Sequence, residues 1–302
     1  MRRAVWCLWP WLVLPVCPVV AQDLEPRQYA NIPQGFNFLA AGYGLSEGSV
    51  LVDPSIELEN AELEVDGPLL GYARGIALGR MSGKFDAAIG HVCLSGSADY
   101  EGERVMRDVC GSTDLRARWS VNFLGAPALP LAEFGGYEQD LIVGASLQVS
   151  APIGQYDPDR LVNIGTNRWA LKAEVGASKR WSKWMLEVAL AQAFFEDNDE
   201  FFGGHQREQD PLVGLQVHVV RNLSSGIWVA FDATHYEGGE STTNGVPSED
   251  RLSNARLGAT VSFPINVHQS VRVHLSSGIS TRTGSDFDTV AVSWQYRWAE
   301  GF

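Results

Sequence analysis

The sequence predicts an all-β protein: a single closed antiparallel transmembrane β-barrel of about 12 strands, with short periplasmic turns and longer extracellular loops. The N-terminus has the pattern of a secretory signal. No later apolar run approaches the about 18 residues that a membrane-spanning helix needs. The rest of the chain alternates apolar and polar residues with a period of two. Because only helices and closed barrels satisfy their backbone in lipid, this combination favours a barrel.

Residues 1–21 have the parts of a cleavable signal peptide. Arg2 and Arg3 form a positive start, residues 5–20 are apolar, and Ala21 is the small residue before a cleavage site. The apolar stretch is too short for a transmembrane helix, and its three prolines would break one. We therefore expect export to the cell outer membrane of a Gram-negative bacterium.

A cysteine within the signal leaves a second processing route open. Cys17 is where a lipoprotein would be modified, but Val16 is larger than the residue that usually precedes a lipidated cysteine. Cleavage after Ala21 is the interpretation that we adopt. Residues 22–34 are then expected to be a periplasmic N-terminal segment, and residues 35–302 the barrel.

The charge of the chain limits its partners. The 302 residues carry a formal net charge of −13. Nucleic acid is excluded as a partner, because phosphate binding needs clustered Lys and Arg. The expected partners are outer-membrane lipid and lipopolysaccharide, the barrel-assembly machinery and a small-molecule permeant.

The last predicted strand shows the alternation most clearly. From Thr289 to Trp298 one face carries apolar and aromatic side chains, and the other carries small and polar ones together with Arg297. Phe302 follows closely. A final strand that closes on an aromatic residue resembles the signal that the outer-membrane assembly machinery reads.

The same pattern recurs along the chain. The predicted strands are 35–46, 68–79, 83–94, 113–124, 139–151, 168–180, 184–196, 211–221, 226–236, 252–264, 270–282 and 287–298. Short gaps alternate with long ones, as they do in bacterial barrels, except at the long gap 125–138 and the short gap 283–286. Arg74 is a second irregularity, since it falls on the apolar face of its strand. A bulge or an outward Gly/Ala face would each explain it.

Two cysteines follow the signal, and they predict a structural disulfide. Cys93 and Cys110 would meet an oxidising compartment, and no histidine beside them indicates a zinc site.

A family resemblance adds to these patterns. The run from Ser150 to Trp169, SAPIGQYDPDRLVNIGTNRW, resembles the hallmark of the outer-membrane transporters of the MetA-pathway of phenol degradation family. Residues 122–128, 209–211, 228–239 and 294–298 resemble it too. The resemblance implies an outer-membrane barrel with a channel role, and it implies hydrophobic or aromatic compounds as cargo.

The alternation predicts which charged side chains face the barrel interior. Seven cations, four carboxylates and two histidines belong to this set: Lys84, Asp86, Arg116, Arg118, Lys172, Glu174, Glu187, His218, Asp232, Arg256, Arg272, His274 and Arg297. One interpretation is a pore lining with a mild preference for anions. The other is a lattice of ion pairs that fills a narrow lumen.

The loop between residues 152 and 167 has two interpretations as well. Its special residues, with the first residue of the next strand, are Asp157, Asp159, Arg160, Asn163, Asn167 and Arg168. They could fold into the barrel mouth as a constriction, or they could satisfy the turns of the loop itself.

The first long gap, 47–67, contains a run of acidic residues: Asp53, Glu57, Glu59, Glu62, Glu64 and Asp66. The spacing matches no calcium loop, so a solvated acidic face is the better interpretation of the run than a cation bridge to lipid.

The sequence contains no signature of an enzyme. No local Ser/His/acid pattern surrounds His205 or His235, and motifs for metal or phosphate binding are missing. We predict no catalysis, no metal and no cofactor. The predicted function is passive uptake of small molecules through an outer-membrane channel, and the alternative is a non-conducting barrel for structure or surface adhesion.

The first prediction concerns location and closure. Cell fractionation should place the protein in the outer membrane, and gel mobility should change on heating, because a closed barrel resists detergent until it is heated. A protein recovered freely soluble from the periplasm would refute the barrel.

Overall fold

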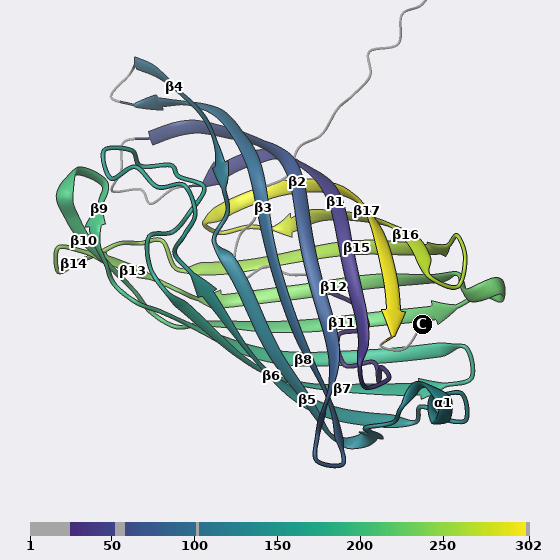
Figure 1. Ribbon diagram of the computed structural model, residues 1–302. Coiled ribbons are helices and arrows are strands. Elements are labelled where there is room, and N and C mark those ends of the chain that lie inside the picture. Colours follow the sequence, from purple (N-terminus) through teal and green to yellow (C-terminus); the bar gives the residue numbers. More distant parts are fainter. Residues whose placement is uncertain (1–24, 52–57, 101–102, 300–302) are drawn as a thin grey trace, which may run out of the picture.

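The protein is a closed antiparallel barrel with a twisted extension at one end (Figure 1). The computed structural model describes residues 25–51, 58–100 and 103–299. The expected signal peptide, Phe302, Asp53 and Glu57 lie outside the described residues.

Twelve strands form the barrel, each paired antiparallel with its neighbours in the ring, and β1 pairs with β17 to close it. They are β1 (Phe36–Leu51), β2 (Leu58–Leu78), β3 (Met81–Tyr100), β5 (Leu115–Pro127), β6 (Leu141–Ala151), β7 (Ala170–Trp181), β8 (Trp184–Phe195), β11 (Leu212–Asn222), β12 (Trp228–Gly238), β15 (Leu252–Pro264), β16 (Gln269–Ser280) and β17 (Gly284–Ala299). The predicted fold class and strand number are confirmed.

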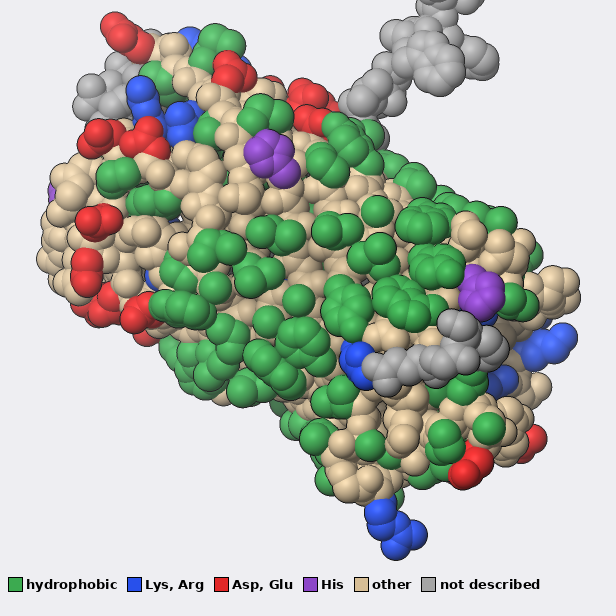
Figure 2. Space-filling view, viewed as in Figure 1, with side chains coloured by type: hydrophobic (Ala, Val, Ile, Leu, Met, Phe, Trp, Pro, Cys, Tyr) green, Lys and Arg blue, Asp and Glu red, His purple; other side chains and the backbone are tan. Residues whose placement is uncertain are grey.

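Burial in the barrel wall is the inverse of burial in a soluble protein. Phe231 is 66% exposed, whereas its neighbour Asp232 is 2% exposed. Figure 2 shows hydrophobic side chains covering the middle of the visible face, with acidic side chains gathered at the end that carries the extension. An apolar outer band around a polar interior is the arrangement that a lipid bilayer requires.

Within the described residues, no helix has the length and apolar character needed to cross a bilayer. The few helical turns are α1 (Leu131–Phe134), η1 (Phe202–Gly204) and η2 (Ser224–Gly226). The helix α1 lies in the long gap 125–138, which the sequence analysis named as an exception to the alternation of short and long gaps.

The gaps 47–67 and 95–112 were predicted as loops, and this prediction was wrong for most of their length. The strands β2 and β3 run on beyond the barrel, and β4 (Glu103–Ser112) pairs with the upper part of β3. We call this extension, residues 58–67, 91–100 and 103–112, the flap. Glu62 and Glu64 are exposed on one of its faces, while Val65 and Leu94 are buried on the other. The sequence analysis expected a strand to have an apolar outer face, whereas the outer face of the flap is charged because it lies against water rather than lipid.

A small second sheet lies at the same end of the barrel as the flap (Figure 1). It consists of β9 (Asn198–Phe201), β10 (His205–Gln209), β13 (Ser241–Thr243) and β14 (Val246–Pro247). The predicted long gaps after β8 and β12 therefore contain short strands that pair with one another.

Arg74 lies on the outer face of β2. The register of β2 with β3 is continuous from Leu69 to Leu78, so no bulge inverts the strand there. Leu70, on the same face, is 51% exposed, whereas a side chain at Gly75 would point inward to within 2.3 Å of the Pro33 carbonyl oxygen. The outward Gly/Ala interpretation does not apply, because the inner face is the one that carries Gly71, Ala73 and Gly75.

The predicted disulfide is confirmed. Cys93 on β3 lies directly opposite Cys110 on β4, and their sulfur atoms are bonded. The bond crosses the flap outside the twelve-stranded ring, so it stabilises the extension rather than the wall.

The second prediction concerns this bond. Thiol labelling of intact, unreduced cells should give no signal at Cys93 or Cys110. Reduction of the disulfide should remove about 3 kcal/mol of stabilisation from loop closure. Trypsin should therefore cut faster at Arg104 and Arg107 in β4. Heat-modifiable mobility should persist because the ring is untouched. The double variant Cys93→Ser/Cys110→Ser is the control, and an unreduced protein that cuts equally fast would contradict the prediction.

Candidate lumen site

Residues 25–34 lie inside the barrel, and we call this segment the plug. The sequence analysis expected residues 22–34 to be periplasmic, which needs correction for residues 25–34. Pro26, Tyr29 and Pro33 are buried among lumen side chains, and the backbone turns where the Ala30 amide donates to the Arg27 carbonyl oxygen at 3.2 Å. The segment lacks the period-two pattern of a strand, and nothing in its sequence indicates the lumen that receives it.

The centre of the plug is Tyr29, which is 3% exposed. Its hydroxyl donates to Glu174 Oε1 at 2.8 Å, and its carbonyl oxygen accepts from Asn122 Nδ2 at 3.3 Å. Its ring lies against Gly144 on β6 and Gly176 on β7, which are directly opposite each other. A Cβ at Gly176 would come within 2.2 Å of the ring, so the space for tyrosine exists because both positions lack a side chain.

An ionic contact holds the start of the plug. Arg118 Nη2 lies 2.5 Å from Glu25 Oε2 and 2.7 Å from Asp86 Oδ1. Lys84 lies 3.7 Å from the other oxygen of Asp86 and donates to the Gln28 carbonyl oxygen at 3.5 Å. Since the Arg118 side chain is only 6% exposed, these carboxylates supply the partners that a buried guanidinium needs.

Two further contacts fix Arg27. Its backbone amide donates to the carboxylate of Glu187, which is 3% exposed. Its guanidinium lies 5.4 Å from the ring centre of Trp228, and Arg272 lies 5.3 Å from the same ring. Two guanidinium groups therefore lie near one indole ring, and the negative electrostatic potential of the ring face attracts them.

Backbone hydrogen bonds hold the C-terminal end of the plug, where the chain passes from the lumen into the wall. The Gln34 amide donates to Leu129 at 2.9 Å, and the Gly35 amide donates to Gly75 at 2.9 Å. Gly35 has a φ of 72°, a conformation that glycine adopts without strain, and it joins the plug to β1. This is the one covalent connection between the plug and the described wall.

A chain of polar side chains continues beyond the plug. His218 Nδ1 lies 2.7 Å from Asp232 Oδ1, and the Thr260 hydroxyl lies 3.2 Å from Asp232 Oδ2 and 3.0 Å from His274 Nδ1. In a catalytic triad the imidazole stands between the carboxylate and the hydroxyl. Here the hydroxyl stands between the carboxylate of Asp232 and the second imidazole, so the order is that of a structural network.

Three other charged residues that were predicted to face the lumen lie at different positions along the barrel. Arg256 is buried and donates to the Phe287 carbonyl oxygen at 2.6 Å. Lys172 is 7% exposed. Arg297 is exposed at the end of β17, where its Nε donates to the Val267 carbonyl oxygen in the β15–β16 turn at 2.8 Å.

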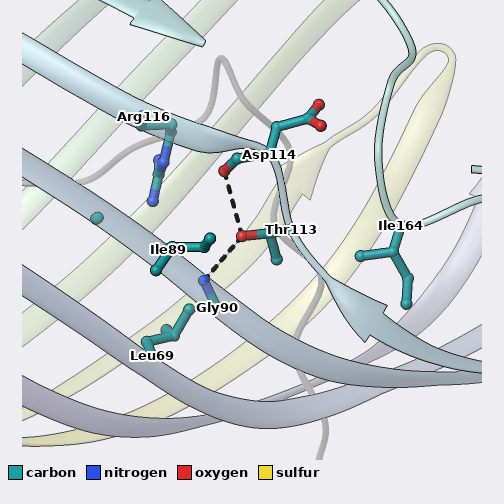
Figure 3. A pocket seen from close by; sticks show the side chains of 8 residues that line it. Leu69, Ile89, Gly90, Thr113, Asp114, Arg116 and Ile164 are labelled. Carbon is teal, nitrogen blue, oxygen red and sulfur yellow. Dashed lines mark hydrogen bonds between the residues drawn. The ribbon is translucent and has the colours of Figure 1, made fainter. Parts of the chain in front are cut away.

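The strand pairing along β3 is interrupted beside Arg116, where its partner changes from β4 to β5 (Figure 3). Thr113 fills the break: its hydroxyl accepts from the Gly90 amide at 2.9 Å and donates to the Asp114 carbonyl oxygen at 3.3 Å. A recess of about 30 Å³ lies there, lined by Leu69 and Ile164 among others, and has room for about one water molecule.

The loop 152–169 is anchored by Asp114, a residue that the sequence analysis did not identify. Its two carboxylate oxygens accept from the amides of Gly154 and Thr166, each at 2.9 Å. Loop residues Val162 and Ile164 pack against the buried face of the flap. The carboxylate therefore ties both arms of the loop to the top of β5.

Most polar candidates of this loop bond to the loop itself. Asp157 Oδ1 accepts from the Asp159 amide at 3.0 Å, and Asn163 donates to the carbonyl oxygens of Asp157 and Arg160 at 3.0 and 2.9 Å. Asp159 and Arg160 are exposed. These contacts are those of turn chemistry.

Arg168 and Asn167 bond beyond the loop. Asn167 donates to Asn198 Oδ1 at 3.1 Å. Arg168 donates to Gln209 and lies over the ring of Phe195 at 4.8 Å. Burial, with the like charge of Arg207, lowers the pKa of Arg168 to about 10.

Tertiary structure thus adds Tyr29, Asn122, Gly144, Gly176 and Trp228 to the lumen site. Glycine in a strand does indicate a close approach of another group, and this signal was present at Gly144 and Gly176. No pattern connected those glycines with a tyrosine more than a hundred residues away. Among the described residues, no group of three or more His, Cys, Asp or Glu is placed to hold a metal ion.

Comparisons with known proteins agree with this geometry. A family model described as "Putative MetA-pathway of phenol degradation" matches residues 123–296. The COG4313 outer membrane channel from Pseudomonas putida F1 is similar with 20% identity, a TM-score of 0.78, and coverage of 91% of this chain and 100% of that chain. The transport unit of the autotransporter AIDA-I from Escherichia coli shares 11% identity, with a TM-score of 0.52 over 92% of this chain and 93% of that one. Comparison with curated protein sequences finds no match.

The third prediction concerns the seat of Tyr29. In Gly176→Ala the new Cβ would lie 2.2 Å from the Tyr29 ring. The ring would therefore be displaced from its position between β6 and β7. Losing a buried aromatic contact costs about 3 kcal/mol, and plug docking should weaken roughly a hundredfold. Trypsin digestion of the purified barrel, followed by mass spectrometry, should then show faster cleavage after Arg27.

The control for this experiment is Gly71→Ala. Its new Cβ would meet its nearest atom at 3.8 Å, an ordinary contact with no part of the plug. Equal cleavage after Arg27 in both variants would show that the glycine pair does not hold the plug.

Proposed function

This chain belongs to the MetA-pathway of phenol degradation family, and we propose that it is an outer-membrane channel for passive uptake of small molecules, closed in this structure by the plug. The observation that carries the proposal is that the wall is complete without residues 25–34. All strand pairings of the ring are made among other residues, and the plug is held mainly by side chains and by two backbone bonds at its exit. Withdrawal of the plug would leave the ring closed and the lumen open.

The lining supports a preference among permeants. Glu25 is one of the two carboxylates that contact Arg118. When the plug leaves, it removes one carboxylate, Glu25, and one cation, Arg27. The side chains of the wall that are predicted to face the lumen stay, and they include seven cations and four carboxylates. We propose a mild preference for anions over cations of equal size, because fixed charges select permeants.

Two comparisons support a proposal about the class of molecule that passes through the channel. The family description names phenol degradation, and the similar Pseudomonas protein is described as an outer membrane channel. We propose small hydrophobic or aromatic compounds as the permeants. We also propose that lipopolysaccharide surrounds the extracellular end and that the barrel-assembly machinery inserts the chain.

A non-conducting barrel is the second candidate, and one observation favours it. Tyr29 and Arg118 are buried, and carboxylates contact both, so the plug and the barrel wall are joined in one polar lattice at this level. Catalysis is not part of either proposal, since the His218–Asp232 pair has the bonding order of a structural network.

The fourth prediction separates these two candidates. Single-channel current should be measured on the purified, refolded protein and on a variant that lacks residues 25–33. The channel proposal predicts rare small openings for the intact protein and sustained openings of larger amplitude for the deletion, because the wall remains closed around an emptied lumen.

Lys183→Gln, an exposed position in the turn between β7 and β8 and outside the plug, is the control and should conduct like the intact protein. Heat-modifiable mobility should verify the fold of each variant. A folded deletion variant that carries no current would overturn the channel and leave the non-conducting barrel.

A further inference from the structure

We infer that the seat of Tyr29 is a binding site for a small neutral phenol, which the plug's own tyrosine occupies in the closed barrel. The inference rests on the proposed channel function and adds to it a site, a class of ligand and a means of opening. A tyrosine side chain is a 4-alkylphenol, so the closed structure shows directly how a phenol fits this part of the lumen.

The ring has a seat shaped for a flat aromatic group. Gly144 and Gly176 stand opposite each other on β6 and β7, and a Cβ on either would come within 2.7 Å or 2.2 Å of the ring. Ala126, Ile142 and Ala189 join Tyr29 in one buried apolar cluster. Small or apolar residues therefore lie against the ring, while polar and charged side chains are buried elsewhere in the lumen.

The far end of the seat recognises a hydroxyl group. Glu174 is 3% exposed, and its Oε1 accepts from the tyrosine hydroxyl and from Gln28 Nε2, both at 2.8 Å. Its Oε2 accepts from Gln216 Nε2 at 3.3 Å. A buried carboxylate needs donors, and the plug supplies two of the three that these bonds show.

This chemistry discriminates among aromatic molecules. A neutral phenol would restore the hydrogen bond to Glu174 when the plug withdraws. An aromatic hydrocarbon has no donor and would leave the carboxylate short of a partner. A benzoate or a phenolate would place a second negative charge against Glu174 in a poorly solvated place.

Competition for the seat links binding to opening. The tyrosine ring and a phenol cannot occupy the same space, so a phenol binds only when the plug has left. By linkage, a ligand that binds the open state alone shifts the population toward that state. Phenol at sufficient concentration would therefore favour the open channel that admits it.

The test uses equilibrium dialysis of radiolabelled 4-methylphenol with purified, refolded barrels in detergent. Tyr29→Ala empties the seat, and Tyr29→Ala/Gly176→Ala narrows it again and serves as background for partition into detergent. We expect one saturable site in Tyr29→Ala, binding at least tenfold weaker in the unmodified protein, and no saturable binding in the double variant. Toluene and benzoate should compete at least tenfold more weakly than unlabelled 4-methylphenol. Equal binding by Tyr29→Ala and the double variant, or equal competition by toluene, would overturn the inference.

A second measurement needs no substitution. Trypsin cleavage after Arg27 in the unmodified protein should accelerate with 4-methylphenol and stay unchanged with toluene at the same concentration. Absence of acceleration at saturating 4-methylphenol would overturn the inference even if Tyr29→Ala failed to fold. The current measured on the plug deletion is independent of the dialysis and trypsin measurements. A deletion variant that binds 4-methylphenol but carries no current would refute the channel and support the phenol site. A deletion variant that conducts but does not bind 4-methylphenol would support the channel and refute the site.

Discussion

The lipid interior offers no hydrogen-bond partner to a free strand edge, so every strand of this protein depends on the pairing of β1 with β17 that closes the ring. Phe36 stands opposite Ala299 at one end of that seam, and Leu51 stands opposite Gly284 at the other. Closure gives each strand one side toward lipid and one toward the lumen. The exposed apolar band and the buried charges both follow from it.

A narrow lumen lined by charges creates a second requirement, which the plug satisfies. Buried ionised groups are costly unless partners surround them. Glu25 pairs with Arg118, the Arg27 amide meets Glu187, and Tyr29 donates to Glu174. The plug is thus part of the polar lattice of the lumen. Opening must replace these bonds with water or with a permeant that can make them.

The flap shows how one alternating pattern serves two environments. Within the membrane the outward residues are apolar, while Glu62 and Glu64 take the outward positions above it. Val65 and Leu94 keep the inner face apolar, and Val162 from the long loop packs against them. Asp114 anchors that loop at the point where β4 ends and β5 begins. The extracellular end is therefore a packed structure, not a set of independent loops.

The sequence by itself determined the barrel, because period-two alternation reports which face of each strand meets lipid. The segments predicted at 184–196 and 252–264 agree with β8 and β15 within a residue at each end, and the lumen positions of Arg118, Glu174 and Asp232 followed from the same parity. The flap was missed although residues 61–66 alternate apolar and acidic side chains, because the acidic run was interpreted as the solvated face of a loop. Only the tertiary structure decided what fills the lumen. The contact of Tyr29 with Gly176 joins a segment without periodicity to a strand far along the chain, and local pattern carries no information about such a contact.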